Sequence, residues 1–182
     1  MKQCKMDLFP ECIGYCPHGA VFSQDKQYRY RLWRKWGEGS NIMFIGLNPS
    51  TANESTNDPT IRRLIGFAKQ WEYTGISMYN LFGLVSAYPE ALLTNKDPIQ
   101  EPNTNLNNEW LMNGFMSHET IVFCWGSWKI SNLNDRVKTI VDELKTPFQS
   151  GKKVMCFGTN KDGQPKHPLY LNKNTELIKF ES

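Results

Sequence analysis

Four short apolar runs recur along the chain, and they constrain its fold more than any other feature. They cover residues 41–47 (NIMFIGL), 75–84 (GISMYNLFGL), 120–126 (TIVFCWG) and 152–158 (KKVMCFG). Continuous apolar runs of this length are typical of strands that are buried on both faces of a sheet. Helical patterns lie between them, and strands that alternate with helices form parallel sheets with helices on both faces. The sequence therefore predicts a three-layer α/β/α domain with a mainly parallel, four-stranded central sheet.

The helix between the first two runs has the clearest start. Asp58 and Pro59 suit its N-cap and its first helical position. Apolar residues then recur on one helical face, at Ile61, Leu64, Ile65, Ala68 and Trp71. We expect a helical turn at residues 89–93 and further helices at residues 105–116 and 133–144.

The other segments extend this core without adding a second domain. Residues 20–23 and 28–36 predict a first hairpin or edge strands, and residues 175–180 a short last strand. The chain has 182 residues, which is enough to bury one core. We expect an irregular leader over residues 1–19 and a single domain over residues 20–182.

Charge and hydropathy limit the partners. The formal net charge is only +3, so no strong overall field attracts a polyanion. No run approaches the ~20 apolar residues of a membrane span, and the N-terminus lacks the apolar region of a signal peptide. We expect a cytoplasmic protein without a membrane partner. Residues 28–36 (YRYRLWRKW) are basic and aromatic, which fits either a nucleic-acid contact or a half-buried strand whose charged side faces water.

Three of the five cysteines lie near the N-terminus. Cys4, Cys12 and Cys16 form with His18 the spacing C-x7-C-x3-C-x-H, which lacks the close C-x2-C pair of zinc sites. We expect reduced thiols there, and neither a metal nor a cofactor in the protein. A zinc or iron–sulfur site is the alternative.

Polar residues, glycines or prolines follow all four apolar runs. Parallel sheets bind ligands outside the carboxyl ends of their strands, which meet at one edge. Convergence at that edge predicts a pocket. The candidate residues are Asn48, Ser50, Thr51, Asn80, Phe82, Trp125, Gly126, Lys161, Asp162, His167 and Tyr170.

These residue types suit a flat ligand ring that forms hydrogen bonds. An asparagine amide presents a donor and an acceptor side by side, as a base edge requires. Phe82 and Trp125 are candidates to stack on the ring, and His167 to stabilise negative charge on a departing base. The motifs of phosphate-binding loops, dinucleotide folds, serine-hydrolase elbows and zinc deaminases are missing from the sequence.

The order of the motifs resembles the uracil-DNA glycosylase superfamily over residues 42–172. Its members carry Gly-x-Asp-Pro or Gly-x-Asn-Pro after the first core strand, and residues 46–49 (GLNP) are similar. They carry a base-reading asparagine at the end of the next strand, as Asn80 does. A "WG" or similar pair ends their third strand, and a late His-Pro matches His167-Pro168.

The chain more closely resembles a bacterial and phage family, domain of unknown function 1643. The matching motifs are LNPSTA, DPTIRR, NLF, WG and KDGxPxHPLYL, together with the YRYRLW segment that precedes them.

The superfamily resemblance implies roles for individual residues. Asn48 would position or weakly activate a water molecule, Asn80 would bind the base edge, and His167 would stabilise the departing base. Ser50 and the backbone around it would contact phosphate or sugar. Asp58 is either the catalytic carboxylate or only the helix cap. Arg63, or its neighbour Arg62, either grips a phosphate or lies on an exposed helix face.

The leading functional prediction is a glycosylase-like enzyme that binds a base or modified base, in nucleic acid or in a nucleotide, and hydrolyses its N-glycosidic bond without a metal. Its predicted catalytic residues are Asn48, Asp58 and His167. One alternative is a non-catalytic nucleotide or modified-base binder in a phage modification or defence context. Another is a different nucleotide hydrolase that uses Asp58 or Asp162.

Overall fold

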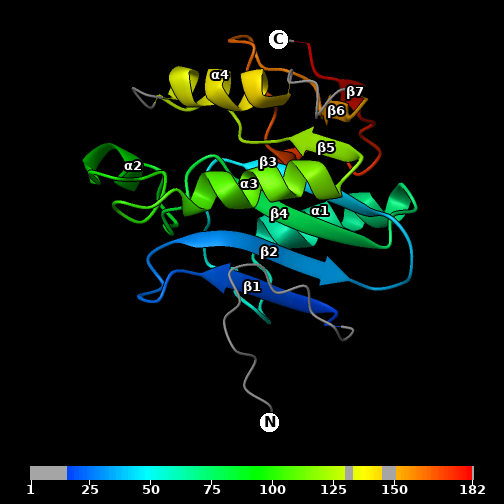
Figure 1. Ribbon diagram of the computed structural model, residues 1–182. Helices are drawn as coiled ribbons and strands as arrows, with labels where there is room; N and C mark the ends of the chain where they lie inside the picture. The colour runs from blue at the N-terminus through cyan, green and yellow to red at the C-terminus, as the bar shows by residue number, and fades with distance from the viewer. Residues whose placement is uncertain (1–15, 130–132, 145–150, 182) are drawn as a thin grey trace.

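The computed structural model describes residues 16–129, 133–144 and 151–181. Within these ranges, seven strands form one sheet in the order β1-β2-β4-β3-β5-β6-β7 (Figure 1). The strands are β1 His18–Phe22, β2 Arg29–Lys35, β3 Asn41–Gly46, β4 Gly75–Asn80, β5 Thr120–Phe123, β6 Lys153–Cys156 and β7 Ile178–Lys179. The helices are α1 Pro59–Gln70, α2 Ala91–Thr94, α3 Leu106–Ser117, α4 Leu133–Leu144 and the short 3-10 helix η2 Pro168–Tyr170.

The sheet is mixed. Strand β3 is parallel to β4 and β5, and β5 is parallel to β6. The other three pairings, β1 with β2, β2 with β4 and β6 with β7, are antiparallel. The predicted α/β class is confirmed, and the four predicted core strands, β3 to β6, are parallel to one another. The sheet as a whole is not the expected four-stranded, mainly parallel one, because it has seven strands and three of its six pairings are antiparallel.

The additional strands come from the N-terminal hairpin and from the end of the chain. From Tyr30 onward the β2 strand alternates buried and half-buried residues, which marks a strand but not the neighbour it joins. It pairs with β4 and supplies the backbone hydrogen bonds that β4 would lack at an open edge. Strand β1 begins at His18, so it includes the last two residues of the leader expected over residues 1–19.

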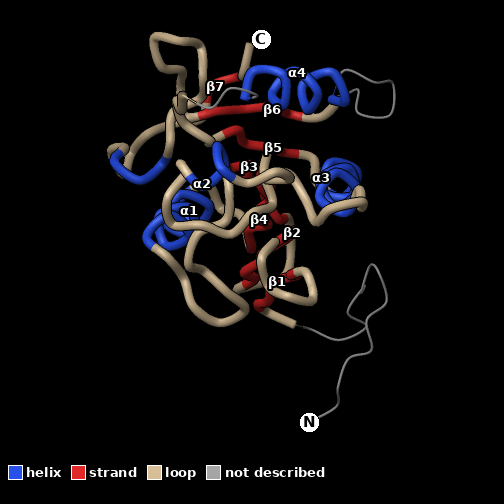
Figure 2. Tube along the Cα trace, turned by 90° about the vertical axis from the view of Figure 1, so that its left-hand side faces the viewer, coloured by secondary structure: helices blue, strands red, loops and turns tan. Residues whose placement is uncertain are grey.

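Helices cover both faces of the sheet, and β3 shows why its run is apolar throughout. Ile42 and Phe44 belong to the core beneath α1, whereas Met43 and Ile45 belong to the core beneath α3. Successive side chains of a strand point to opposite faces, so a strand covered on both faces needs an apolar residue at nearly every position. Figure 2 shows the sheet edge-on, with α1 and α3 on opposite sides.

Helix α1 begins where the sequence predicts. Asp58 is its N-cap and accepts a hydrogen bond at Oδ1 from the backbone N–H of Ile61 at 2.8 Å, and Pro59 is the first helical residue. The second predicted strand, in contrast, ends at Asn80 rather than at Leu84. Beyond β4 the backbone stays beside the end of β3, since the N–H groups of Leu81 and Phe82 donate to the carbonyls of Gly46 and Leu47, both at 2.9 Å.

Candidate functional site

An open groove of about 700 Å³ lies between the loops that follow β5 and β6, at the carboxyl ends of these parallel strands. We call it the loop groove. Five of the predicted site residues line it, namely Gly126, Lys161, Asp162, His167 and Tyr170. The remaining lining residues are Ser127, Trp128, Asn160, Lys166 and Leu171.

One backbone hydrogen bond joins the two loops of the groove, and a second closes the loop after β6. The Gly126 N–H donates to the Pro165 carbonyl at 3.0 Å, and the Lys166 N–H donates to the Gly158 carbonyl at 2.8 Å. Gly126 has a φ of +77°, a conformation that glycine adopts without steric cost. A Cβ atom added there would also lie 3.3 Å from the Cβ atom of His167. The Trp-Gly pair therefore sets how closely the first loop approaches His167.

Two aromatic rings and two lysines line the groove around His167. The side chain of Trp128 is 40% exposed and that of Tyr170 is 93% exposed. The Trp128 indole is held in place, since its Nε1 donates to the Trp125 carbonyl at 2.7 Å. Lys161 is exposed and Lys166 half-buried. Exposed rings that stack on bases and cations that meet phosphates are the combination found in single-strand binding grooves.

A polar network ties the two loops together beside these rings. The Ser127 hydroxyl donates to Asp162 Oδ1 at 2.9 Å and accepts from Asn160 Nδ2 at 2.8 Å. The backbone N–H of Gln164 also donates to Asp162 Oδ1, at 3.1 Å. Asp162 thus orders the turn at residues 160–164, as an aspartate in a tight turn commonly does.

His167 presents a single free ring nitrogen. Its Nδ1 accepts a hydrogen bond from the backbone N–H of Leu169 at 3.4 Å and so caps η2. A ring that accepts at Nδ1 carries its proton on Nε2 in the neutral state. Burial lowers the pKa of His167, and the nearby carboxylate of Asp58 partly opposes that shift. The imidazole is therefore a neutral hydrogen-bond donor at pH 7.

Asp58 lies close enough to His167 to affect its charge, although it does not line the groove. It is buried, and its Oδ1 caps α1. Arg63 connects the same helix to η2, because its guanidinium donates to the Leu171 carbonyl and lies 4.7 Å from the centre of the Phe67 ring. Arg63 is thus used for packing between α1 and η2.

Asn48 holds two loops together. Its Nδ2 donates to the Ser86 carbonyl at 2.9 Å, to the Pro49 carbonyl at 3.0 Å and to the Leu84 carbonyl at 3.4 Å. These bonds join the loop after β3 to the segment after β4. The Asn48 amide therefore holds these two segments in position through their backbone carbonyls.

Asn80 is buried at the end of β4, away from the groove. Its Oδ1 accepts from Arg29 at 3.4 Å, and its Nδ2 has no hydrogen-bond partner among the described residues. Arg29 is itself buried and donates to the Ala52 carbonyl at 2.8 Å. The predicted base-reading amide thus faces an arginine of β2.

The structure corrects the prediction that Phe82 and Trp125 stack on a ligand. Phe82 and Trp125 are fully buried, so neither offers a ring face to a ligand. Both follow apolar strands directly and continue into the core, where Trp125 packs 4.6 Å from the Phe123 ring centre. Trp128 takes the exposed position instead. Sequence reasoning missed it, although its place three residues after Trp125 in the loop is a signal of exposure.

The polar loop after β3 is held down by the basic segment. Arg34 donates to the carbonyls of Asn53 and Thr56 at 2.6 and 3.2 Å and to Asn57 Oδ1 at 2.7 Å. Arg29 and Arg34 are both buried, so they point inward rather than to water or to a polyanion. Ser50 is half-buried and Thr51 exposed on this loop, outside the groove lining.

The N-terminal cysteines bear on the expectation that the protein holds no metal. Cys4 and Cys12 lie outside the described residues, so the absence of a metal there stays a prediction. Among residues 16–129, 133–144 and 151–181, no cluster of three or more His, Cys, Asp or Glu side chains could hold a metal ion. No helix in those ranges has the length and apolar character that crossing a membrane requires.

Comparison with known proteins gives one result. The family model described as "Protein of unknown function (DUF1643)" matches residues 29–169. No curated protein and no solved structure matches the chain. The matched range begins at the first residue of β2 and includes α1, the central strands and His167. Because this range covers most of the chain, the protein belongs to the DUF1643 family.

Proposed function

We propose that the protein binds a nucleotide or a stretch of nucleic acid in the loop groove and hydrolyses the N-glycosidic bond of its base. One observation carries the proposal: Trp128, Tyr170, Lys161, Lys166 and His167 line a single groove. The rings stack on the base, and the lysines meet the phosphate. His167 donates its Nε2–H to a base oxygen.

The proposed reaction is dissociative. The bond between the sugar C1′ and the base nitrogen breaks, and its electron pair leaves with the base. His167 stabilises the resulting anion, since a donor aimed at developing charge lowers the barrier. Water then adds to the oxocarbenium-like sugar and releases a proton. Asp58 is the candidate to accept that proton, because it lies near His167 and its Oδ2 makes no hydrogen bond within the described residues.

The test is base release. The protein is incubated with single-stranded oligonucleotides and nucleotides that carry uracil, hydroxymethyluracil or bulkier bases, and free base is measured by mass spectrometry. We expect release by the wild type and its loss in His167→Ala. Trp128→Ala and Tyr170→Ala should raise KM more than they lower kcat, because they remove binding contacts.

A matched control is Tyr88→Ala. Tyr88 is as exposed as a stacking residue, at 75%, but lies in the loop before α2 and away from the groove. It should leave both constants unchanged. Release that survives in His167→Ala at the wild-type rate would contradict the catalytic assignment.

A second candidate is a binder that performs no chemistry on the same ligand. It is favoured by the engagement of Asn48 and Asn80, since the amides assigned to water and base contact the protein instead. Tryptophan fluorescence of the wild type, compared with that of Trp128→Phe, distinguishes the two. Base-dependent quenching without any released base would establish binding alone.

A further inference from the structure

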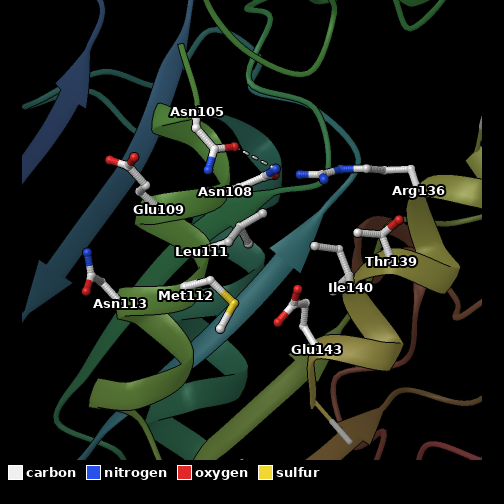
Figure 3. Close-up of a pocket in the computed structure, with 10 residues that line it drawn as sticks. All are labelled: Asn105, Asn108, Glu109, Leu111, Met112, Asn113, Arg136, Thr139, Ile140 and Glu143. Carbon is white, nitrogen blue, oxygen red and sulfur yellow. Dashed lines mark hydrogen bonds between the residues drawn. The ribbon is translucent and has the colours of Figure 1, made fainter. Parts of the chain in front are cut away.

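A second pocket lies between α3 and α4, on the sheet face that these helices cover. It has a volume of about 450 Å³. Its apolar wall is Leu111, Met112 and Ile140, and the remaining lining is polar (Figure 3). We call it the α3–α4 pocket. It shares no lining residue with the loop groove.

Arg136 closes one end of this pocket with an incompletely paired cation. The residue is only 5% exposed. Its Nε donates to the Leu81 carbonyl at 2.8 Å, whereas its buried Nη2 has no hydrogen-bond partner among the described residues. Figure 3 shows the guanidinium pointing from α4 across the pocket toward Asn108 on α3. A buried guanidinium N–H without a partner is costly, so this end of the pocket is built to receive an acceptor.

The charge of Arg136 is uncompensated as well. Burial lowers its pKa to about 10, which leaves it cationic at pH 7, and no charged side chain contributes to that shift. Glu109 and Glu143 line the pocket, but neither forms a salt bridge with Arg136 within the described part of the chain. A water molecule would satisfy the free N–H, whereas only an anion offsets the buried charge.

Asn108 supplies a second unsatisfied atom at the same end. Its Nδ2 donates to Asn105 Oδ1 at 3.1 Å, and its buried Oδ1 has no partner in the described ranges. The polar end of the pocket therefore holds one free donor and one free acceptor. Leu111, Met112 and Ile140 form an apolar wall beside this end, which gives the pocket the polarity of a site for a small amphipathic molecule.

We propose that the α3–α4 pocket binds a small molecule through an oxyanion, a carboxylate or a phosphate, which pairs with Arg136 while its apolar part lies against Leu111, Met112 and Ile140. Guanidinium groups bind such oxyanions in a planar, two-bond geometry. This site is additional to the loop groove and does not depend on the function proposed for it.

The experiment measures thermal unfolding of the whole chain with two probes at constant ionic strength. Inorganic phosphate supplies an oxyanion alone, and benzoate supplies a carboxylate with an apolar ring. Sodium chloride is the reference. We expect a saturable rise in Tm of about 3–6 °C at a probe concentration near ten times Kd. A larger response to benzoate identifies a carboxylate ligand, and a larger response to phosphate identifies a phosphate ligand.

Three variants locate the effect. Asn108→Asp places a carboxylate opposite the guanidinium, so it should raise the basal Tm and abolish the response to both probes. Arg136→Gln should abolish the response, and Lys138→Gln, an exposed site on the same helix with the same change in charge, should retain it. No shift beyond sodium chloride in the wild type, or an equal shift in Asn108→Asp, overturns the proposal. Because Asn108→Asp retains Arg136 and its bond to Leu81, the test does not depend on Arg136→Gln folding.

Discussion

His118 links the stability of the fold to pH through a single buried ring. It is buried at the C-terminal end of α3, and its Nδ1 lies 2.8 Å from the Gly114 carbonyl, to which it donates. Burial lowers its pKa from 6.5 to about 4. The unfolded chain therefore takes up a proton near pH 6.5, which the folded chain resists until about pH 4. Stability falls as the pH falls through this window, by about 3 kcal/mol in total.

Urea unfolding between pH 7 and pH 4 measures this loss. His118→Asn keeps a side-chain donor for Gly114 but cannot titrate, so most of the decline should disappear. A smaller decline should remain, because burial lowers the pKa of His167 in the same direction. An unchanged decline in His118→Asn would show that the ring is not its source.

Asn48 gives the second prediction at this scale. Asn48→Asp replaces an amide that donates to three carbonyls with a carboxylate that repels them. We expect a loss of unfolding free energy of about 1–3 kcal/mol, measured by urea denaturation. Base release should not rise with the added carboxylate. A stable variant with faster release would instead mean that Asn48 acts on the water, as the superfamily resemblance implies.

Single residues show how far the sequence could be taken. His167 and Asp162 could be placed in a groove because the strands before them were recognisable and parallel neighbours share an edge. Phe82 and Trp125 could not be assigned correctly, because an aromatic at the end of an apolar run continues the core as readily as it faces a ligand. The partners of Asn48 and Asn80 depend on segments that no local pattern places beside them.

At the scale of the secondary-structure elements, variants of Asp58 separate its role as the cap of α1 from its proposed role in catalysis. Asp58→Ala removes the acceptor for the Ile61 N–H and should reduce stability by about 1–2 kcal/mol. Asp58→Asn keeps a capping oxygen, so its free energy of unfolding should lie within about 0.5 kcal/mol of the wild-type value. Urea unfolding checks both values.

The same pair of variants tests the chemistry. If Asp58 takes a proton from the attacking water, Asp58→Asn lowers kcat while its stability is preserved. If Asp58 is only the cap, its carboxylate takes no part in the reaction. The stable variant Asp58→Asn then keeps the wild-type kcat. This comparison answers the question that the sequence left open between a catalytic carboxylate and a cap.

The elements themselves were predicted unevenly. Strands β3 to β6 follow from continuous apolar runs and helix α1 from apolar periodicity, and both are local signals. The place of β2 beside β4 does not follow, because pairing across more than forty residues leaves no mark in either strand. The parallel pairings among β3, β4, β5 and β6 were predicted, whereas the antiparallel pairings of β2 with β4 and of β6 with β7 were not.

At the scale of the whole molecule, the modest net charge of +3 predicts how binding responds to salt. Long-range attraction is weak, so phosphate contacts come from Lys161 and Lys166 in the groove. Two such contacts on a single strand give a slope of about −1.4 for log K against log salt. Fluorescence titration with a short oligonucleotide at several salt concentrations measures the slope.

The double variant Lys161→Gln with Lys166→Gln should flatten that slope close to zero. Lys69→Gln with Lys138→Gln is the matched control, because both side chains are exposed on helices outside the groove. It should leave the slope unchanged. A slope much steeper than about −1.4 in the wild type would mean that a wider surface contacts the polymer.

The strand order of the sheet also decides when the protein can fold during synthesis. Strand β3 lies in the middle, yet both of its neighbours, β4 and β5, come later in the chain. A ribosome therefore releases Ile42 to Ile45 long before Thr120 to Phe123 exist to cover one side of them. Until then this apolar strand is exposed in the nascent chain, where chaperones and other unfolded chains compete for it.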